Sequence, residues 1–281
     1  MLKLICCALI AIIFNVEVMA KELRYPNIHG IGESTLGFSI LKLALSEVEN
    51  DYHLTVSPLK VTPNRAKFML ESGQLDVFDS GFIPELEESL EPIYLPLEMG
   101  LLGWRIFIVH KDMLEKLRLI NTLDELKDFV VGQGIGWGDI TILEHAGFKV
   151  LTATKMENLI KMVEHKRFDL LPLGANEAYR FLELFGEQSD QLTVDNTIAL
   201  VYPYGRFFYV QKNNTELKQV IETGMMRALE DGSLLALLKS HPFSRDAFER
   251  ANLGGRVQIR IDTPNLTQGF KAIDQKWWYA P

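Results

Sequence analysis

The sequence predicts an α/β fold in which mostly parallel strands are covered by helices. Short apolar runs of strand length alternate with segments of helical periodicity, a pattern typical of parallel sheets. Helix-start signals recur between the runs, as at Thr62-Pro63 and in the capping box Thr122–Glu125. Of the 281 residues, 47% are hydrophobic and 23% are charged, so the chain has the composition of a globular protein with enough apolar residues for a core.

The N-terminal part of the chain alternates strands and helices regularly. Each helix begins at a Ser or Thr that can cap it, and a glycine or a polar residue follows its end. The expected elements are a strand at Glu22–Tyr25, a helix at Leu36–Asn50 capped by Ser34 or Thr35, a strand at His53–Leu59, a helix from Thr62 to Ser72 and a strand at Leu75–Phe78.

The same alternation continues through the middle of the chain, and the C-terminal part is mainly helical. Strands are expected at Pro92–Leu97, Leu101–Val109, Phe129–Val131, Val150–Leu151, Phe168–Leu173, Ile198–Tyr202, Phe207–Gln211 and Val257–Ile261. Helices are expected after the capping boxes at Thr122 and Thr154. Two more are expected, one that follows Glu177 and runs to Phe185, and one over Thr215–Leu253 with a break at Asp231-Gly232. An aromatic segment, Trp277–Tyr279, ends the sequence.

The glycine-rich segment Phe129–Ile142 is the strongest local indication of a binding site. Its apolar strand ends in four glycines at alternate positions, Gly132, Gly134, Gly136 and Gly138, and a helix follows. A loop of this kind exposes backbone N–H groups at the start of the helix, where anions and dipoles bind. Because the glycines are spaced by two, they do not match the dinucleotide fingerprint. We therefore expect this loop to form one wall of a cleft for another ligand.

Residues 1–20 have the features of a cleaved secretory signal. Lys3 supplies the positive charge, Leu4–Phe14 is an apolar run, and Val18–Ala20 ends in a pattern of small residues. The run is shorter than the roughly 20 apolar residues that a membrane helix needs; the alternative is a buried N-terminal helix. Cleavage after Ala20 would place residues 21–281 in the periplasm and remove Cys6-Cys7, leaving neither a disulfide nor a thiolate metal site.

Charge and motifs exclude several function classes. The formal net charge is −8 and Lys and Arg form no cluster, so neither nucleic acid nor an anionic membrane is an expected partner. The sequence contains no G-x-S-x-G, no H-E-x-x-H and no Walker motif. Its six histidines are scattered singly. We therefore expect no catalytic residue, no metal ligand and no cofactor.

Polar and aromatic residues that follow predicted strands are the candidate ligand-binding residues, because ligands of open α/β sheets bind at the carboxyl ends of the strands. They are Ser34, Asp79, Ser80, Arg105, Trp137, Asp139, Asn176, Glu177, Tyr204 and Arg206. The alternative for Asp79, Asp139 and Asn176 is helix capping. For Trp137 it is packing in the core, and for Arg105, which interrupts an apolar strand, an edge-facing position.

Seven landmarks occur in a characteristic order between Leu23 and Phe243. They are Leu75–Val77 after Gly73, Pro92-x-Tyr94, Arg105–Lys111, Leu123–Lys127, Val131-Gly132, Lys166–Asp169 and Ala228–Ser233. In this order the chain resembles the type II periplasmic solute-binding proteins, in the amino-acid-type (family 3) branch of transporter substrate-binding proteins. Gly100–Arg105, Trp137–Asp139 and Trp277–Tyr279 resemble, more narrowly, a divergent subgroup of proteobacterial exported proteins of undefined ligand.

The resemblance implies a two-lobed type II fold. Each lobe would be a mostly parallel sheet flanked by helices, and two crossing strands would act as the hinge. Lobe 1 would comprise residues 21–104 and 206–281, and lobe 2 residues 105–205. The ligand would lie between them, with the glycine loop facing Asp79 and Arg105, Trp137 as a stacking surface and Asp139 as a hydrogen-bond acceptor. The implied partners are a small molecule and a membrane permease or sensor receptor, and the chain would be a monomer.

One family feature is missing. Amino-acid binders of this family carry an Arg shortly after the strand that matches Leu75–Phe78, where it binds the ligand's carboxylate. Residues 80–87 contain no Arg, and Leu173 occupies a position that tends to be Arg in the subgroup. Arg105 or Arg206 would have to bind any anionic group of the ligand.

The leading hypothesis is a non-catalytic, exported solute-binding protein that captures a small polar metabolite, amino-acid-like or another small organic molecule, for an ABC transporter or a membrane sensor. An alternative is an enzyme on the same fold, such as a small-molecule dehydratase or lyase that uses Glu177 or Asp139 as general base. A further alternative is a degenerate sensory partner without a transport role.

Overall fold

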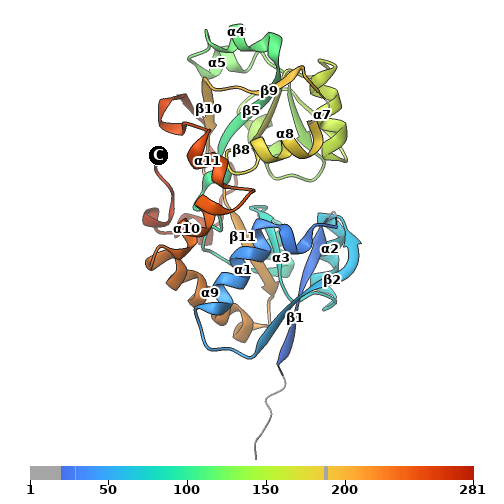
Figure 1. Cartoon of the computed structure of the whole chain (residues 1–281), viewed down its shortest axis with the longest axis vertical. Helices are drawn as coiled ribbons and strands as arrows, with labels where there is room; N and C mark the ends of the chain where they lie inside the picture. Colours follow the sequence, from blue (N-terminus) through green and yellow to red (C-terminus); the bar gives the residue numbers. More distant parts are fainter. Residues whose placement is uncertain (1–19, 29, 187–188) are drawn as a thin grey trace, which may run out of the picture.

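The computed structural model of the chain describes residues 20–28, 30–186 and 189–281 and confirms the α/β fold. It has two lobes, stacked along the long axis of the molecule (Figure 1). The predicted signal segment lies outside the described residues, apart from Ala20. Among the helices of the described ranges, none combines the length and the apolar character needed to cross a membrane.

The lower lobe in Figure 1 contains two small sheets and the helices that pack on them. One sheet is the parallel pair β1 (Lys21–Ile28) and β2 (Tyr52–Val61). The other has the order β3-β11-β4, with β3 at Phe78–Gly81, β11 at Arg206–Gln211 and β4 at Leu90–Ile93. The helices are α1 (Leu36–Ser46), α2 (Pro63–Glu71), α3 (Leu86–Ser89), α9 (Thr215–Glu230) and α10 (Ser233–Ser240).

The upper lobe is built on a seven-stranded sheet of order β12-β10-β5-β8-β6-β7, with β9 paired to β5. The strands are β5 (Trp104–His110), β6 (Val131–Gly134), β7 (Val150–Ala153), β8 (Leu170–Gly174), β9 (Leu192–Val194), β10 (Ile198–Val201) and β12 (Val257–Arg260). The helices are α4 (Leu114–Leu117), α5 (Leu123–Leu126), α6 (Asp139–His145), α7 (Met156–Glu164), α8 (Ala178–Gly186) and α11 (Arg245–Glu249). A last short helix, α12 (Gln268–Lys271), precedes the aromatic segment.

Two strands set the direction of pairing. Every antiparallel pair of the described residues involves β5 or β11, whereas β1–β2, β6–β7, β6–β8 and β10–β12 are parallel. β5 begins the first segment that enters the upper lobe, and β11 begins the segment that returns to the lower lobe (Figure 1). The alternation of strands and helices therefore gives parallel pairs within each lobe, and the connecting strands reverse the direction.

The C-terminal segment contacts both lobes. β12 pairs with β10 in parallel, from Ile198 opposite Val257 to Val201 opposite Arg260, and therefore lies in the upper sheet. Phe270 of α12 packs instead against Phe82 and Phe207 of the lower lobe. The expected division of the chain assigned all of residues 206–281 to lobe 1. In the structure, β12 from this range pairs with a strand of the upper sheet.

Three of the four predicted helix starts form the expected side-chain hydrogen bonds. The hydroxyl of Thr35 accepts from the N–H of Phe38, and Thr62 caps α2, where Pro63 is the first residue. Thr122 and Glu125 form both bonds of a capping box before α5. The capping box at Thr154 is wrong: α7 begins at Met156, and the cap position, Lys155, makes no side-chain bond.

Three strand predictions were displaced along the chain. One is the strand expected at Pro92–Leu97, which the structure has as β4 at Leu90–Ile93. The strand expected at Leu75–Phe78 is wrong in position, because β3 begins only at Phe78. The preceding residues are held differently: the carboxylate of Asp76 accepts from the backbone N–H and the guanidinium of Arg24. Asp79 and Ser80 therefore lie within a strand instead of following one. Likewise β6 spans Val131–Gly134, so two glycines of the predicted loop belong to the strand.

Candidate functional site

Arg105 is buried at the junction of the two lobes. It is the second residue of β5 and only 1% of its surface is exposed. Its Nη2 donates to Oδ1 of Asp139, the first residue of α6, at 2.5 Å. The hydroxyl of Tyr202 donates to the same oxygen at 2.5 Å. A charge-assisted bond and a phenolic hydroxyl thus fix the carboxylate of Asp139 at the start of its helix.

Arg206, the first residue of β11, is surrounded by carboxylates. Its Nε donates to Oε1 of Glu98 at 2.8 Å, and its Nη1 lies 3.3 Å from Oδ2 of Asp79. The hydroxyl of Tyr25 donates to the other oxygen of Asp79. Glu98 is only 2% exposed and belongs to the loop between β4 and β5. The guanidinium of Arg206 therefore holds two acidic side chains of the lower lobe together.

Glu177 joins these two groups across the lobes. Its Oε1 lies 3.5 Å from Nη1 of Arg105, and its Oε2 lies 3.6 Å from Nη2 of Arg206. The backbone N–H of Gly174, at the end of β8, also donates to Oε1. We call the connected side chains the ion cluster. It consists of Asp79, Glu98, Arg105, Asp139, Glu177 and Arg206.

Two tyrosines cover the ion cluster on the connection between β10 and β11. The ring centroids of Tyr202 and Tyr204 lie 5.6 Å and 5.2 Å from the guanidinium carbon of Arg105, within the range of a cation–π interaction. Gly138, which precedes α6, leaves room for this arrangement. A Cβ at Gly138 would lie 2.9 Å from the hydroxyl of Tyr204 and 2.6 Å from the carbonyl oxygen of Phe82 in the lower lobe. The glycine loop therefore touches the opposite lobe at a position where only a residue without a side chain fits.

Burial and neighbouring charges shift the ionisation of the ion cluster. Burial raises the pKa of Glu98 to about 7; Arg206 opposes this shift, whereas Glu177 and Asp79 add to it. Burial also disfavours the charged form of Arg105, but Asp139 and the other acidic neighbours outweigh this, so the pKa of Arg105 lies above its usual range. For Tyr202 and Tyr204, burial raises the pKa well above normal, so both remain neutral hydrogen-bond donors.

The structure brings most of the candidate binding residues together. Asp79, Arg105, Asp139, Glu177 and Arg206 belong to the ion cluster, Tyr204 covers it, and Asn176 is buried next to Glu177. The capping alternative for Asp139 is not what the structure has, since no side-chain bond caps α6. Whether these residues bind a ligand stays a prediction.

Three candidate residues lie apart from the ion cluster. Trp137 is half-buried, with its indole against Gly134 and the apolar core of the upper lobe. This position agrees with the packing alternative and leaves the stacking role a prediction. Ser34 is exposed after β1, and Ser80 is half-buried in β3. Neither serine side chain makes a hydrogen bond within the described ranges.

Sequence reasoning missed Glu98, Tyr202 and Tyr25. Glu98 is a lone acid between the apolar residues Leu97 and Met99, which is the same signal that singled out Arg105. Tyr202 and Tyr25 were counted as the last residues of apolar strands, although a buried Tyr hydroxyl needs a partner. Each of these signals was present in the sequence.

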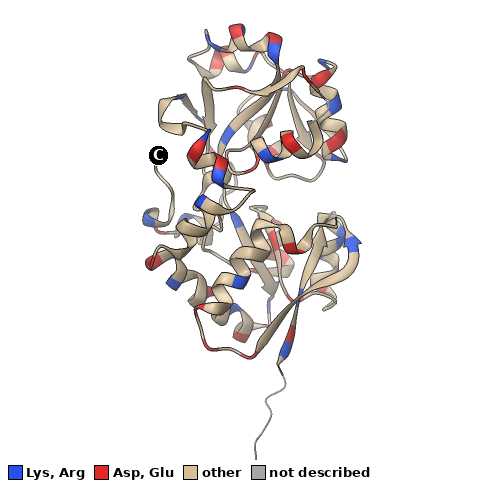
Figure 2. Cartoon of the chain, in the orientation of Figure 1, with Lys and Arg blue, Asp and Glu red and all other residues tan. Residues whose placement is uncertain are grey.

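No metal site accompanies the ion cluster. Within residues 20–28, 30–186 and 189–281, no group of three or more Asp, Glu, His or Cys side chains is arranged to hold a metal ion. The acidic groups of the ion cluster are instead bound by the two guanidiniums. In the view of Figure 2, acidic and basic residues are interspersed along the ribbons of both lobes.

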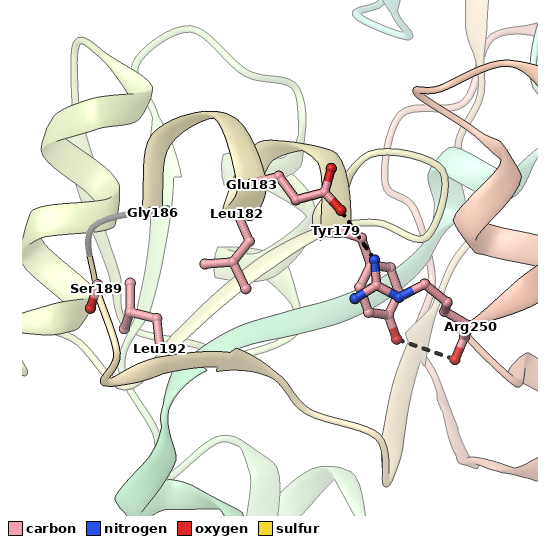
Figure 3. A pocket seen from close by; sticks show the side chains of 7 residues that line it. All are labelled: Tyr179, Leu182, Glu183, Gly186, Ser189, Leu192 and Arg250. Atoms are coloured by element: carbon pink, nitrogen blue, oxygen red, sulfur yellow. Dashed lines mark hydrogen bonds and ion pairs between the residues drawn. The ribbon is translucent and has the colours of Figure 1, made fainter.

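A separate cavity of about 260 Å³ lies beside α8 in the upper lobe. Figure 3 shows Arg250 at one end, with its guanidinium 4.2 Å from the ring centroid of Tyr179 and 3.2 Å from Oε1 of Glu183. The other lining residues are Leu182, Gly186, Ser189 and Leu192. None of the candidate binding residues lines this cavity, and its charged groups are paired with each other.

The comparisons with known proteins give the fold. No family model and no curated protein matches the chain. An amino-acid ABC transporter substrate-binding protein from Streptococcus pneumoniae, bound to L-arginine, superposes with a TM-score of 0.58 over 82% of this chain and 97% of its own, at 15% identity. The chain has the type II periplasmic-binding-protein fold. The predicted two-lobed architecture is thereby confirmed; the narrower subgroup stays a prediction.

Other proteins with this type II fold have different roles. A structure from work on glutathione import through GshT and a cystine ABC importer in Streptococcus mutans gives a TM-score of 0.59 at 14% identity, over 84% of this chain and 96% of its own. A histidine kinase sensor domain gives 0.56 at 8% identity, over 80% and 97%. The fold is therefore shared by structures from importer systems and by a sensor domain.

Proposed function

We propose that the chain is an exported solute-binding protein that captures a small polar metabolite between its two lobes. The ligand is held at the ion cluster, and its binding stabilises the closed arrangement of the lobes. The protein acts as a monomer and delivers the ligand, or the signal of its presence, to a membrane permease or a sensor receptor. Its neighbours in fold come from importers and from a sensor domain, which supports both kinds of partner.

The contact of Glu177 with both arginines carries this proposal. Glu177 follows β8 of the upper lobe, whereas Arg206 begins β11 of the lower lobe, and their charged atoms lie 3.6 Å apart. Gly138 of the upper lobe lies against Phe82 of the lower lobe in the same way. Polar side chains from both lobes thus meet at one buried place, which is the arrangement that a ligand between closing lobes requires.

The same contacts support a division of the chain into lobes. We propose that residues 21–104 and 206–281 form lobe 1 and residues 105–205 form lobe 2, with β12 crossing back to join the sheet of lobe 2. The hinge lies where the chain passes between the lobes, at Gly103-Trp104 and at Tyr202–Gly205. Gly103 supports this assignment. A Cβ at this position would lie 2.3 Å from the carbonyl oxygen of Tyr202, so the two connecting segments of the chain lie side by side.

Export and the absence of catalysis belong to the same proposal. The signal-like pattern of residues 1–20 supports delivery to the periplasm, with cleavage after Ala20. Asp139 and Glu177, the two candidates for a general base, are both paired with Arg105, which suits positioning a ligand better than accepting a proton.

A thermal-shift screen of residues 21–281 against a library of small metabolites tests the proposal. A ligand present at 100 times its Kd stabilises the native state by about 2.7 kcal/mol. In a chain of this size, that raises the Tm by roughly 5–10 °C. The proposal predicts at least one such ligand with 1:1 stoichiometry in calorimetry. A library without a single stabilising compound would contradict it.

A further inference from the structure

The ion cluster contains more acidic than basic groups. Two guanidiniums, of Arg105 and Arg206, face four carboxylates, and all six side chains are less than a third exposed. Both guanidiniums are already engaged, Arg105 with two carboxylates and Arg206 with three. With every group ionised, the ion cluster carries two uncompensated negative charges. Both arginines are thus paired with the protein's own carboxylates, although sequence reasoning had assigned them the role of binding an anionic group of the ligand.

Two buried hydrogen-bond acceptors without a partner belong to Glu98 of the ion cluster and to Asn176, which precedes Glu177 in the sequence. Oε2 of Glu98 and Oδ1 of Asn176 are buried and have no hydrogen-bond partner among the described residues. Glu98 is 2% exposed and Asn176 is 5% exposed. One buried donor, Nε of Arg105, also lacks a partner, so among these three residues two acceptors and one donor are unsatisfied. A buried polar atom without a partner is costly, and the cost is relieved by a ligand that supplies the missing donor.

We propose that the ion cluster selects a small organic cation without a carboxylate group, such as a diamine or an alkylguanidine, whose N–H groups bind Glu98 and Asn176. This inference rests on the proposed function and specifies the ligand class of the same site. An ammonium or guanidinium group supplies both the positive charge and the donors that the ion cluster lacks. A ligand carboxylate would meet four acidic side chains, and Nε of Arg105 is the one buried guanidinium donor of the ion cluster that lacks a partner among the described residues.

The aromatic cover fits the same ligand class. Tyr202 and Tyr204 present their ring faces to the guanidinium of Arg105. Aromatic faces attract cations, and more strongly where water is excluded. The junction of the lobes is therefore built from two kinds of group that stabilise positive charge, carboxylates and tyrosine rings.

Binding of a cation is coupled to a proton at Glu98. Because burial raises the pKa of Glu98 to about 7, a fraction of this side chain is protonated at neutral pH. The charged groups that face it are Arg206, Glu177 and Asp79. A bound cation favours the ionised carboxylate, so binding releases a proton. The affinity for the cation should therefore rise between pH 6 and pH 8.

Three probes with the same five-carbon chain test the inference by calorimetry on residues 21–281. They are 1,5-diaminopentane, 5-aminopentanoate and glutarate, which carry two positive charges, one of each sign, and two negative charges. The inference predicts that the diamine binds at least about tenfold more tightly than 5-aminopentanoate, and that glutarate gives no binding heat. Tighter binding of glutarate or of 5-aminopentanoate would overturn it.

A pair of matched variants tests whether the carboxylate of Glu98 binds the diamine. Glu98→Gln keeps the size of the side chain and an oxygen for Arg206 Nε but removes the charge, so it should weaken diamine binding about tenfold or more. Glu91→Gln removes a carboxylate of β4 that is paired with Lys218 away from the ion cluster, and it should leave binding unchanged. Equal affinities of the two variants would contradict the assignment of Glu98. Thermal melting of both variants checks that they are folded.

The outcomes separate this inference from the proposed function. A metabolite screen that yields only neutral or anionic ligands overturns the inference and leaves the proposed function standing. A screen that yields a cationic ligand supports both. If neither the library nor the three probes bind, both are wrong.

Discussion

Nη2 of Arg206 lies 3.6 Å from Oε2 of Glu177, and the two residues come from different lobes. Arg206 begins a strand of the lower lobe and also contacts Asp79 and Glu98 of that lobe. Glu177 follows a strand of the upper lobe and also contacts Arg105. One ion pair therefore connects the charged groups of both lobes.

Replacing Arg206 should destabilise the fold strongly. Arg206→Met keeps most of the packing but leaves Asp79, Glu98 and Glu177 without their shared cation. Removing one partner of a buried ion pair costs about 3 kcal/mol. Urea denaturation at pH 7 measures this loss in the free energy of unfolding.

The matched control for Arg206 is an exposed arginine. Arg118 pairs with Glu115 on the surface, and both side chains are more than half exposed. Arg118→Met should therefore change the free energy of unfolding by less than about 0.5 kcal/mol. A similar loss in both variants would show that the buried carboxylates do not depend on Arg206.

Stability should fall as the pH rises through the range in which Glu98 ionises. The pKa of Glu98 is raised from 4.5 to about 7 in the folded protein. Between these values the folded state binds more protons than the unfolded state, so the free energy of unfolding decreases with increasing pH. The loss is complete above pH 7 and amounts to about 3 kcal/mol for this shift.

The Glu98→Gln variant isolates this contribution from other titrating groups. Urea denaturation at pH 5, 6, 7 and 8 should give a steeper decline for the wild type than for the variant. The free energy of unfolding of the wild type, relative to that of the variant, should fall by about 2.5 kcal/mol between pH 5 and pH 8. Parallel profiles would mean that Glu98 titrates as an ordinary exposed carboxyl.

A glycine in α9 is required for the packing of the lower lobe. A Cβ at Gly224 would overlap the backbone carbonyl of Ala44 in α1. In an open helix position, Gly→Ala stabilises by about 1 kcal/mol. Here Gly224→Ala should instead destabilise the protein by about 2 kcal/mol, because the two helices must separate.

Gly254 provides the control for this substitution. The nearest atom to a Cβ at Gly254 is 3.9 Å away, so Gly254→Ala should be nearly neutral in the same urea denaturation. A stabilising effect of Gly224→Ala would show that α1 and α9 are not in this close contact.

Local signals in the sequence predicted the helices well. Thr35, Thr62 and Thr122 cap their helices because each side chain bonds a backbone N–H only a few residues away. Strand positions were less predictable. β3 is displaced from its expected place because Asp76 is held by Arg24, which is distant in the sequence. β9 was not predicted, since Leu192–Val194 is short and its pairing with β5 is also non-local.

The candidate site was found by one rule, and its omissions follow from that rule. The rule that ligands bind beyond the carboxyl ends of strands led to Arg105, Asp139 and Glu177, which the structure brings together. It could not find Glu98, which lies in the loop before β5 and reaches the ion cluster only through tertiary packing. It also included Ser34, which is exposed, because a loop's direction cannot be inferred from strand positions alone.

The central claim is that the lobes close on a ligand, and a calorimetric titration of two glycine variants tests it most directly. Gly138→Leu places a side chain between the glycine loop and Phe82 of the opposite lobe and should prevent closure; Gly254→Leu, at an open position, serves as control. For a ligand that binds the wild type, we predict at least tenfold weaker binding to Gly138→Leu and unchanged binding to Gly254→Leu. Equal affinity in all three proteins would contradict the account.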